Sequence, residues 1–361
     1  MLDSGHGVAG TRLGAPGGSA IGFRGEEKLG GGLSAWFQCE SSADVRGIDQ
    51  DGFCTRNSAV GFKGGFGNIH FGRWDTPFKR ALNVGSTGSE ETGLLGMSFI
   101  AFGGSGGADL TGQAADASFN RQRWKRRETA LTYYESPRFG GFQVLGAFSA
   151  GGIAAVENNA FDTQNNAKPR LWSFSGIYSA GPLGIGFGYE RHNEVGGANG
   201  VPTAATTPDL DDRAWGAGAS YTFGPAKVGV TYLDAKFETG IGTELKKKTA
   251  TIGVEWAIAG PHNIEAQYVW VDDSKGNSAT GIGGRGGHAA PIQGGVAVGG
   301  TGGDGISIAY RYNFSKRTSI KLGYVRIEND SNTNTYRNGN TASVVNGEDM
   351  SAWAFHIRHR F

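Results

Sequence analysis

Alternation of apolar and polar residues is the strongest pattern in the chain. Along 306–314, isoleucine, tyrosine and phenylalanine occupy every second position, and serine, alanine, arginine and asparagine occupy the others. The same period recurs along 215–223, 249–256 and 264–270. Successive side chains of a β-strand point to opposite faces, so this period predicts strands with one apolar face and one polar face.

The connections between these strands fall into two classes. Seven are tight and carry Gly, Gly-Pro or a short polar pair, at 30–32, 64–66, 138–141, 181–183, 224–226, 260–262 and 315–317. Longer polar stretches alternate with them, among them 194–211, 273–303 and 328–349. Seven tight turns and eight long loops, the N-terminal segment included, require sixteen strands. Tight turns at one end and long loops at the other are typical of a closed outer-membrane barrel.

Composition agrees with one large β domain. The 361 residues include 64 glycines, aromatic residues make up 11%, and the formal net charge is +1. Aromatic content this high argues against disorder, and the near-neutral charge gives no reason to expect a nucleic-acid partner. No apolar run is long enough for a transmembrane helix, whereas alternating strands can still cross a membrane. A barrel of this kind needs a signal peptide, so we expect a mature or truncated chain.

The chain has two cysteines, Cys39 and Cys54, which flank a polar segment. The midpoint of that segment falls at the tip of the hairpin that it would close. The two residues could therefore face each other across two strands. A disulfide would form in an oxidising compartment, and two free thiols are the alternative.

Four segments spread over the chain carry a family resemblance: 22–33, 64–77, 133–142 and 353–361. They are similar to the second strand, the strand entering loop three, the strand leaving it and the last strand of the trimeric general porins of Gram-negative bacteria, most closely the betaproteobacterial branch. The resemblance implies an all-β fold, a 16-stranded antiparallel transmembrane β-barrel with an infolded loop three. It also implies that the terminal Phe361 is the assembly signal read by the outer-membrane insertion machinery.

We therefore expect one barrel domain over 1–361 with a constriction loop at about 76–124. The chain departs from the family in two places. Residues 1–5 resemble the middle of the family's first strand, so we expect that strand to be truncated at its N-terminus. Ala20 stands where the family often has an arginine that faces the lumen.

Arg126 is the first candidate for the pore lining, because it matches a constriction arginine of the family. Alternation along 126–133 independently predicts that the even-numbered residues face the lumen, Arg126 and Glu128 among them. The same alternation predicts that Leu131 and Tyr133 face lipid or a neighbouring subunit.

Three further arginines complete the predicted wall. Arg56 matches another constriction arginine of the family, although alternation alone places it on the outer side. Alternation directs Arg24 toward the lumen. It directs Arg73 outward, where the resemblance implies a contact between subunits.

The long loop carries charges of both signs. Arg123 is a further candidate for the constriction, but together with Arg121 and Lys125 it could equally belong to a solvated loop face. Carboxylates on the loop would set up a field across the pore. The acidic candidates are Glu90, Glu91, Asp109 and Asp116.

These features predict a channel. Guanidinium groups stay charged, so a cluster of them at a narrow point attracts anions and repels cations. We expect passive diffusion of small hydrophilic solutes with anion preference, through a homotrimer integral to the outer membrane. The expected partners are outer-membrane lipid including lipopolysaccharide, small solutes and anions, and no nucleic acid.

Two other functions remain open at this stage. A substrate-specific channel could use the aromatic residues of the long loop, Trp74, Phe99, Phe102 and Trp124. A structural or adhesive surface barrel could use the long loops after 273 and 329.

An enzyme is not expected. The seven histidines are scattered without metal-ligand spacing, and no Ser, His and acid arrangement stands out. We expect no catalytic residue, no metal and no cofactor. The acidic stretches 49–51 and 272–273 could hold Ca²⁺, and a solvated loop is the simpler reading.

Overall fold

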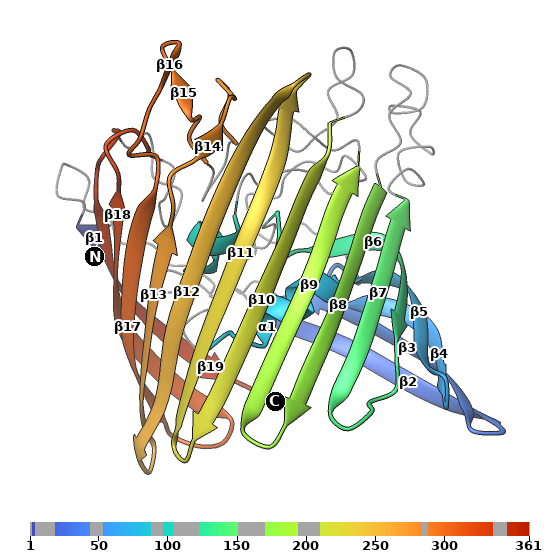
Figure 1. Ribbon diagram of the computed structural model, residues 1–361. Coiled ribbons are helices and arrows are strands. Elements are labelled where there is room, and N and C mark those ends of the chain that lie inside the picture. The colour runs from blue at the N-terminus through green and yellow to red at the C-terminus, as the bar shows by residue number, and fades with distance from the viewer. Residues whose placement is uncertain are drawn as a thin grey trace.

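The computed structural model describes residues 2–3, 19–43, 53–87, 97–103, 123–150, 170–193, 210–282, 288–334 and 345–360. Within these ranges the chain is all-β, and sixteen antiparallel strands form a barrel wall around two short helices (Figure 1). Neither helix among the described residues is long and apolar enough to cross a membrane.

The wall follows chain order. Its strands are β1 (Leu2–Asp3), β2 (Ala20–Gly30), β3 (Leu33–Ser42), β4 (Ser58–Gly64), β5 (Gly67–Asp75), β6 (Arg127–Glu135), β7 (Phe142–Ala150), β8 (Arg170–Ala180), β9 (Leu183–Asn193), β10 (Asp212–Phe223), β11 (Ala226–Gly240), β12 (Thr243–Ala259), β13 (His262–Val271), β17 (Gly303–Asn313), β18 (Thr318–Asn329) and β19 (Met350–His359). From β2 onward each strand pairs with the next, and β19 also pairs with β1. The predicted sixteen-stranded antiparallel fold is confirmed.

The remaining strands are short. They are β14 (Lys275–Gly276), which pairs with β12, and a small hairpin of β15 (Ile292–Gln293) and β16 (Val296–Ala297). The two helices are α1 (Pro77–Asn83) and α2 (Ser98–Phe102). Both helices belong to the long connection between β5 and β6.

The two faces of the wall differ as the alternation predicted. In β17, Ile306, Ile308 and Tyr310 are exposed on the outer face, whereas Ser307 and Ala309 are buried on the inner face. Outward apolar side chains of this kind recur on strand after strand, so the barrel presents an apolar exterior and a more polar interior.

The seven predicted tight turns all join wall strands at one end of the barrel. Among the described residues, the opposite end also holds a tight connection that the sequence did not reveal. It is Ile241–Gly242, which links β11 and β12, the strands of 15 and 17 residues. This hairpin extends beyond its neighbours on the long-loop side (Figure 1).

A β-bulge in β6 overturns one predicted orientation. Residues 129 and 130 lie opposite Arg73 alone, and Ala130 adopts a φ of 49°. The extra residue shifts the alternation by one position. Leu131 and Tyr133 therefore lie on the inner face, with relative exposures of 1% and 0%, and the prediction that they face outward was wrong.

Candidate functional site: an infolded loop opposite an arginine-rich wall

The loop turns into the barrel at the end of β5. Thr76 caps α1, since its side-chain oxygen accepts a hydrogen bond from the backbone N–H of Lys79 at 3.3 Å, and Pro77 occupies the first turn. The helix lies against the inner faces of β8, β9 and β10 (Figure 1). The backbone N–H of Phe78 donates to Ser173 Oγ of β8 at 3.0 Å.

Inward-facing glycines make room for this helix. A Cβ atom on Gly186 of β9 would lie 2.4 Å from the carbonyl oxygen of Ala81. On Gly218 of β10 it would lie 2.7 Å from the same oxygen, and on Gly229 of β11 it would lie 2.1 Å from the oxygen of Gly85. The loop backbone thus lies directly on the strand backbone, which explains the glycines at these positions. We call Gly186, Gly218 and Gly229 the glycine track.

Two later parts of the loop are also fixed to the wall. In α2, the Ala101 carbonyl accepts a hydrogen bond from Thr249 Oγ1 of β12 at 2.7 Å, and Phe102 is buried. Near the loop end, the ring of Trp124 stacks on His192 of β9 with centroids 4.7 Å apart. The described parts of the loop therefore lie over β8–β13 and, through Met97, over β17, whereas on the β2–β5 side α1 reaches the wall through Lys79 and Asp75.

Buried ion pairs fasten the end of the loop. Arg123 pairs with Asp212 of β10, and its guanidinium also lies 5.2 Å from the ring centre of Phe237. Arg126 Nη2 lies 2.5 Å from Glu128 Oε2. Both pairs are almost fully removed from solvent, and each cation has its own carboxylate. We call them the latch: Arg123 joins the loop end to β10, whereas Arg126 and Glu128 lie two residues apart where the loop enters β6. The roles of Arg123, Arg126 and Glu128 in selectivity stay predictions.

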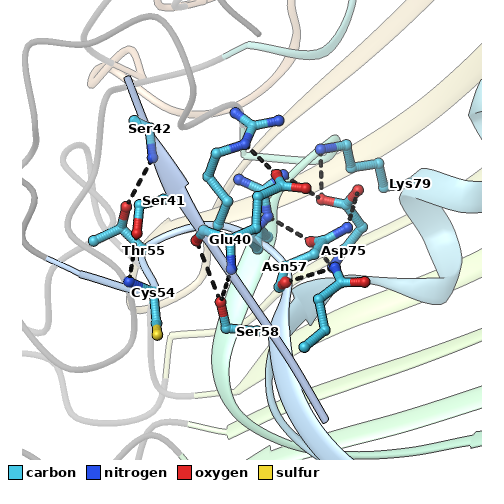
Figure 2. Close-up of polar contacts among 12 residues, drawn as sticks. Glu40, Ser41, Ser42, Cys54, Thr55, Asn57, Ser58, Asp75 and Lys79 are labelled. Atoms are coloured by element: carbon cyan, nitrogen blue, oxygen red, sulfur yellow. Dashed lines mark hydrogen bonds and ion pairs between the residues drawn. The ribbon is translucent and has the colours of Figure 1, made fainter. Parts of the chain in front are cut away.

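A second charged group lies on the β2–β5 side of the barrel, where β3, β4, β5 and β6 meet the start of α1. Asp75 accepts from Lys79 Nζ at 2.7 Å and lies 3.3 Å from Arg127 Nη2. Asn57 ties these residues together, since its Oδ1 accepts from Arg127 Nε at 2.6 Å and its amide donates to Asp75 at 3.2 Å. Figure 2 shows Asn57, Asp75 and Lys79 converging at this point.

Arg56 extends the same group. It forms an ion pair with Glu40 of β3 and acts electrostatically on Arg127, as Arg73 also does. Arg56 precedes β4 in an irregular segment, so the strand alternation that placed it outward does not apply there. We call Arg56, Lys79 and Arg127, with Glu40 and Asp75, the wall cluster.

Arg24 lies beside the wall cluster on β2. It pairs in register with Gln38 of β3, whose amide donates to the Asn57 carbonyl at 2.8 Å. Paired residues of a sheet share a face, so Arg24 points inward, and it is exposed there. Arg73 lies on β5, half-buried. Its proposed contact with another subunit stays a prediction.

The structure describes only some of the remaining predicted site residues. Cys39 and Cys54 form a disulfide with Cα atoms 4.8 Å apart, which closes the loop between β3 and β4. Glu90, Glu91, Asp109, Asp116 and Phe361 lie outside the described residues.

Of the four aromatic residues predicted to line a substrate-specific channel, the structure describes the side chains of Trp74, Phe102 and Trp124. Phe102 and Trp124 both have a relative exposure of 0%, so neither lines an open path. Trp74 is half-buried and lies in edge contact with Trp36, with ring centres 5.8 Å apart.

Of the two acidic stretches considered for Ca²⁺, 49–51 lies outside the described residues. Among the residues that the structure describes, which include 272–273, no group of three His, Cys, Asp or Glu side chains could hold a metal ion. Asp272 lies 3.4 Å from Lys275 Nζ. Asp273 Oδ1 accepts the backbone N–H groups of Thr301 at 2.6 Å and Gly302 at 3.0 Å. Burial by itself would raise the pKa of Asp273. The hydrogen bonds lower it by more, so the pKa lies below its ordinary value.

Sequence reasoning missed Lys79, Asp75 and Arg127. Thr76-Pro77 is a recognisable helix start, and it could have placed the Lys79 side chain one turn from Asp75. Nothing in the sequence distinguishes Arg127 from Arg126, because only the fold decides which of the two faces the lumen and which faces the latch.

Comparison with known proteins identifies the class. Residues 2–332 match the family model described as Gram-negative porin. The outer membrane porin protein 32 of Delftia acidovorans is 28% identical over 95% of this chain and 84% of its own length. The major outer membrane protein P.IB of Neisseria gonorrhoeae is 36% identical over 35% of this chain and 30% of its own.

A solved structure extends the likeness to three dimensions. The anion-selective porin from Comamonas acidovorans superposes with a TM-score of 0.68 at 22% identity, covering 95% of this chain and 89% of that one. The chain belongs to the Gram-negative porin family. It is an integral outer-membrane protein that forms a channel.

Proposed function

We propose that the channel conducts small hydrophilic solutes by passive diffusion and prefers anions. The observation that carries the proposal is the composition of the wall cluster. Its cations outnumber its carboxylates three to two: Arg56, Lys79 and Arg127 against Glu40 and Asp75. Arg24 adds a further exposed cation on the same face.

A surplus of fixed positive charge beside a water-filled path lowers the energy of a passing anion and raises that of a cation. The buried latch contributes less, because Arg123 and Arg126 are each neutralised by a carboxylate. The anion-selective porin of Comamonas acidovorans, which shares the fold, supports the same direction.

Planar-bilayer recording under a KCl gradient tests this proposal. The reversal potential should lie toward the chloride equilibrium potential, and a potential toward that of potassium would refute anion preference. Liposome swelling with a set of sugars and anions provides the second arm. Rates that fall smoothly with solute size support passive diffusion, whereas saturable uptake of one compound would favour a substrate-specific channel.

We also propose that the channel works as a homotrimer surrounded by outer-membrane lipid that includes lipopolysaccharide. The wall is low around β4 and β5, which have 7 and 9 residues. At about 3.3 Å per residue and a tilt of about 40°, β4 rises roughly 18 Å, whereas the 12 residues of β10 on the far side rise roughly 30 Å. Yet Val60, Phe62 and Phe71 are exposed there.

A neighbouring subunit would cover this low, apolar section. Native mass spectrometry in mild detergent should give the mass of three chains. A monomer retaining full conductance would overturn the trimer.

A further inference from the structure

A row of cations crosses the outer face of the barrel near the long-loop end. Register pairs Arg213 of β10 with Arg191 of β9 and with Lys236 of β11. Lys236 in turn pairs with Lys246 of β12, and Lys246 pairs with Lys275 of β14. Five neighbouring strands thus place five like charges side by side, and we call these residues the cation row.

The cation row points away from the lumen. The chain neighbours Asp212 and His192 are fully buried on the inner face, so Arg213 and Arg191 project outward between them. Arg213 is exposed, as are Lys246 and Lys275.

The height of the row is set by the apolar residues below it. On β10 the outward aromatics run from Trp215 to Tyr221 and Phe223, all exposed. Eight residue steps of about 3.3 Å at a tilt of about 40° span roughly 20 Å, close to the lipid-facing band of an outer-membrane barrel. Arg213 is the next outward residue above Trp215. The cation row therefore lies at the level of lipid head groups, on the side of the long loops.

A cavity of about 460 Å³ opens at this level. Its lower edge is aromatic, from Tyr189 and Trp215, and its cationic lining comes from Arg213, Lys236, Lys246, Lys247, Lys248 and Lys275. Three carboxylates also line it: Asp234, Asp272 and Asp273. Cations and a polar rim above aromatic rings are suited to an amphiphile with an anionic head.

Like charges directly opposite each other destabilise a sheet, so the cation row is costly for the bare protein. Neighbouring carboxylates offset part of this cost, since Glu244 pairs with both Lys236 and Lys246, Asp211 pairs with Arg191, and Asp272 pairs with Lys275. Within the described residues, Arg213, which lies between Arg191 and Lys236 in the row, makes no ion pair. An anionic ligand would relieve the remaining repulsion.

We propose that the cation row and its cavity bind the phosphorylated head group of lipopolysaccharide in the outer leaflet. Phosphate oxygens accept charge-assisted hydrogen bonds from Arg and Lys, and guanidinium offers paired donors to them. Trp215 and Tyr189 then lie against the sugar and the upper acyl chains. The inference rests on the proposed lipid environment, and it adds the site and its chemistry.

The test uses the full-length protein, refolded free of lipid in detergent and titrated with diphosphoryl lipid A under native mass spectrometry. The variant Arg213→Glu/Lys246→Glu reverses two exposed charges of the row. The matched control Lys316→Glu/Arg317→Glu makes the same charge change at the exposed tight turn between β17 and β18. Since each cation near an anionic lipid surface contributes about 1 kcal/mol, the row variant should bind at least about tenfold more weakly.

The control should bind like the wild type, and dephosphorylated lipid A should bind weakly to all three proteins. Equal affinity of the row variant and the wild type would overturn the site. Displacement of lipid A by millimolar inorganic phosphate would overturn the glycolipid assignment in favour of a free-anion site.

Conductance and reversal potential separate this proposal from the proposed function. Both should be unchanged in Arg213→Glu/Lys246→Glu, because the cation row lies outside the lumen. Altered ion selectivity in this variant would contradict the outward placement, whereas a cation-preferring wild type would refute only the anion-preferring channel.

Discussion

One added methyl group at Gly186 should unseat the infolded loop. The new Cβ would lie 2.4 Å from the Ala81 carbonyl oxygen and 2.9 Å from its Cα. Because carbon atoms pack at about 3.5 Å, α1 has to move by roughly 1 Å. Overpacking of this kind costs about 1–3 kcal/mol. The ratio of seated to unseated loop should then fall by about 5- to 150-fold in Gly186→Ala.

A cysteine introduced at a buried position of α1 measures how often the loop leaves the wall. Leu82 of α1 has a relative exposure of 0%, so Leu82→Cys should react with a small methanethiosulfonate only when the loop leaves the wall. Mass spectrometry gives the rate of modification, which should rise by the same factor in the Gly186→Ala background. In Gly146→Ala the new Cβ would meet Phe174 at an ordinary 3.5 Å, and the rate should stay at the wild-type value. Equal rates in both backgrounds would refute the glycine track as the seat of the loop.

Three further outcomes follow from contacts around the site. Arg123→Ala leaves Asp212 buried without its cation, which should cost about 3–5 kcal/mol and lower the unfolding midpoint on heated gels, while adding Asp212→Asn should recover part of the loss. Reducing the disulfide between Cys39 and Cys54, which are 15 residues apart, should cost about 3 kcal/mol, and an unchanged urea midpoint would count against it. The folded-state pKa of Asp273 is lowered, so its stabilisation is present above the ordinary carboxylate pKa and is lost as pH falls through the folded value. Hydrogen exchange of the backbone N–H groups of Thr301 and Gly302, which donate to Asp273, should become faster in acid. The substitution Asp273→Asn should remove that pH dependence.

The wall was predictable because alternation and turn chemistry are local signals. The alternation within each strand gives its apolar and polar faces, and the number of tight turns gives the number of strands. The bulge in β6 was not predictable, because Ala130 gives no sign in the sequence of its positive φ. One extra residue there reverses every orientation after it, which explains the error at Leu131 and Tyr133.

The site was predictable only as a region. Which of two adjacent arginines reaches the lumen depends on where the loop leaves the wall, and that is a long-range property of the fold. The glycine track had a usable signal on β9. There Gly184, Gly186 and Gly188 take the inward positions and alternate with outward apolar residues. Such an alternation marks a strand on which another backbone lies.

The reversal potential of Arg56→Glu/Arg127→Glu under a KCl gradient tests the central claim most directly. The two substitutions change the wall cluster from a surplus of one positive charge to a surplus of three negative charges. At about 0.1 M salt the Debye length is about 10 Å, so these charges still act on ions that pass beside them. We predict anion preference in the wild type and cation preference in the variant. An unchanged reversal potential would contradict the assignment of selectivity to the wall cluster.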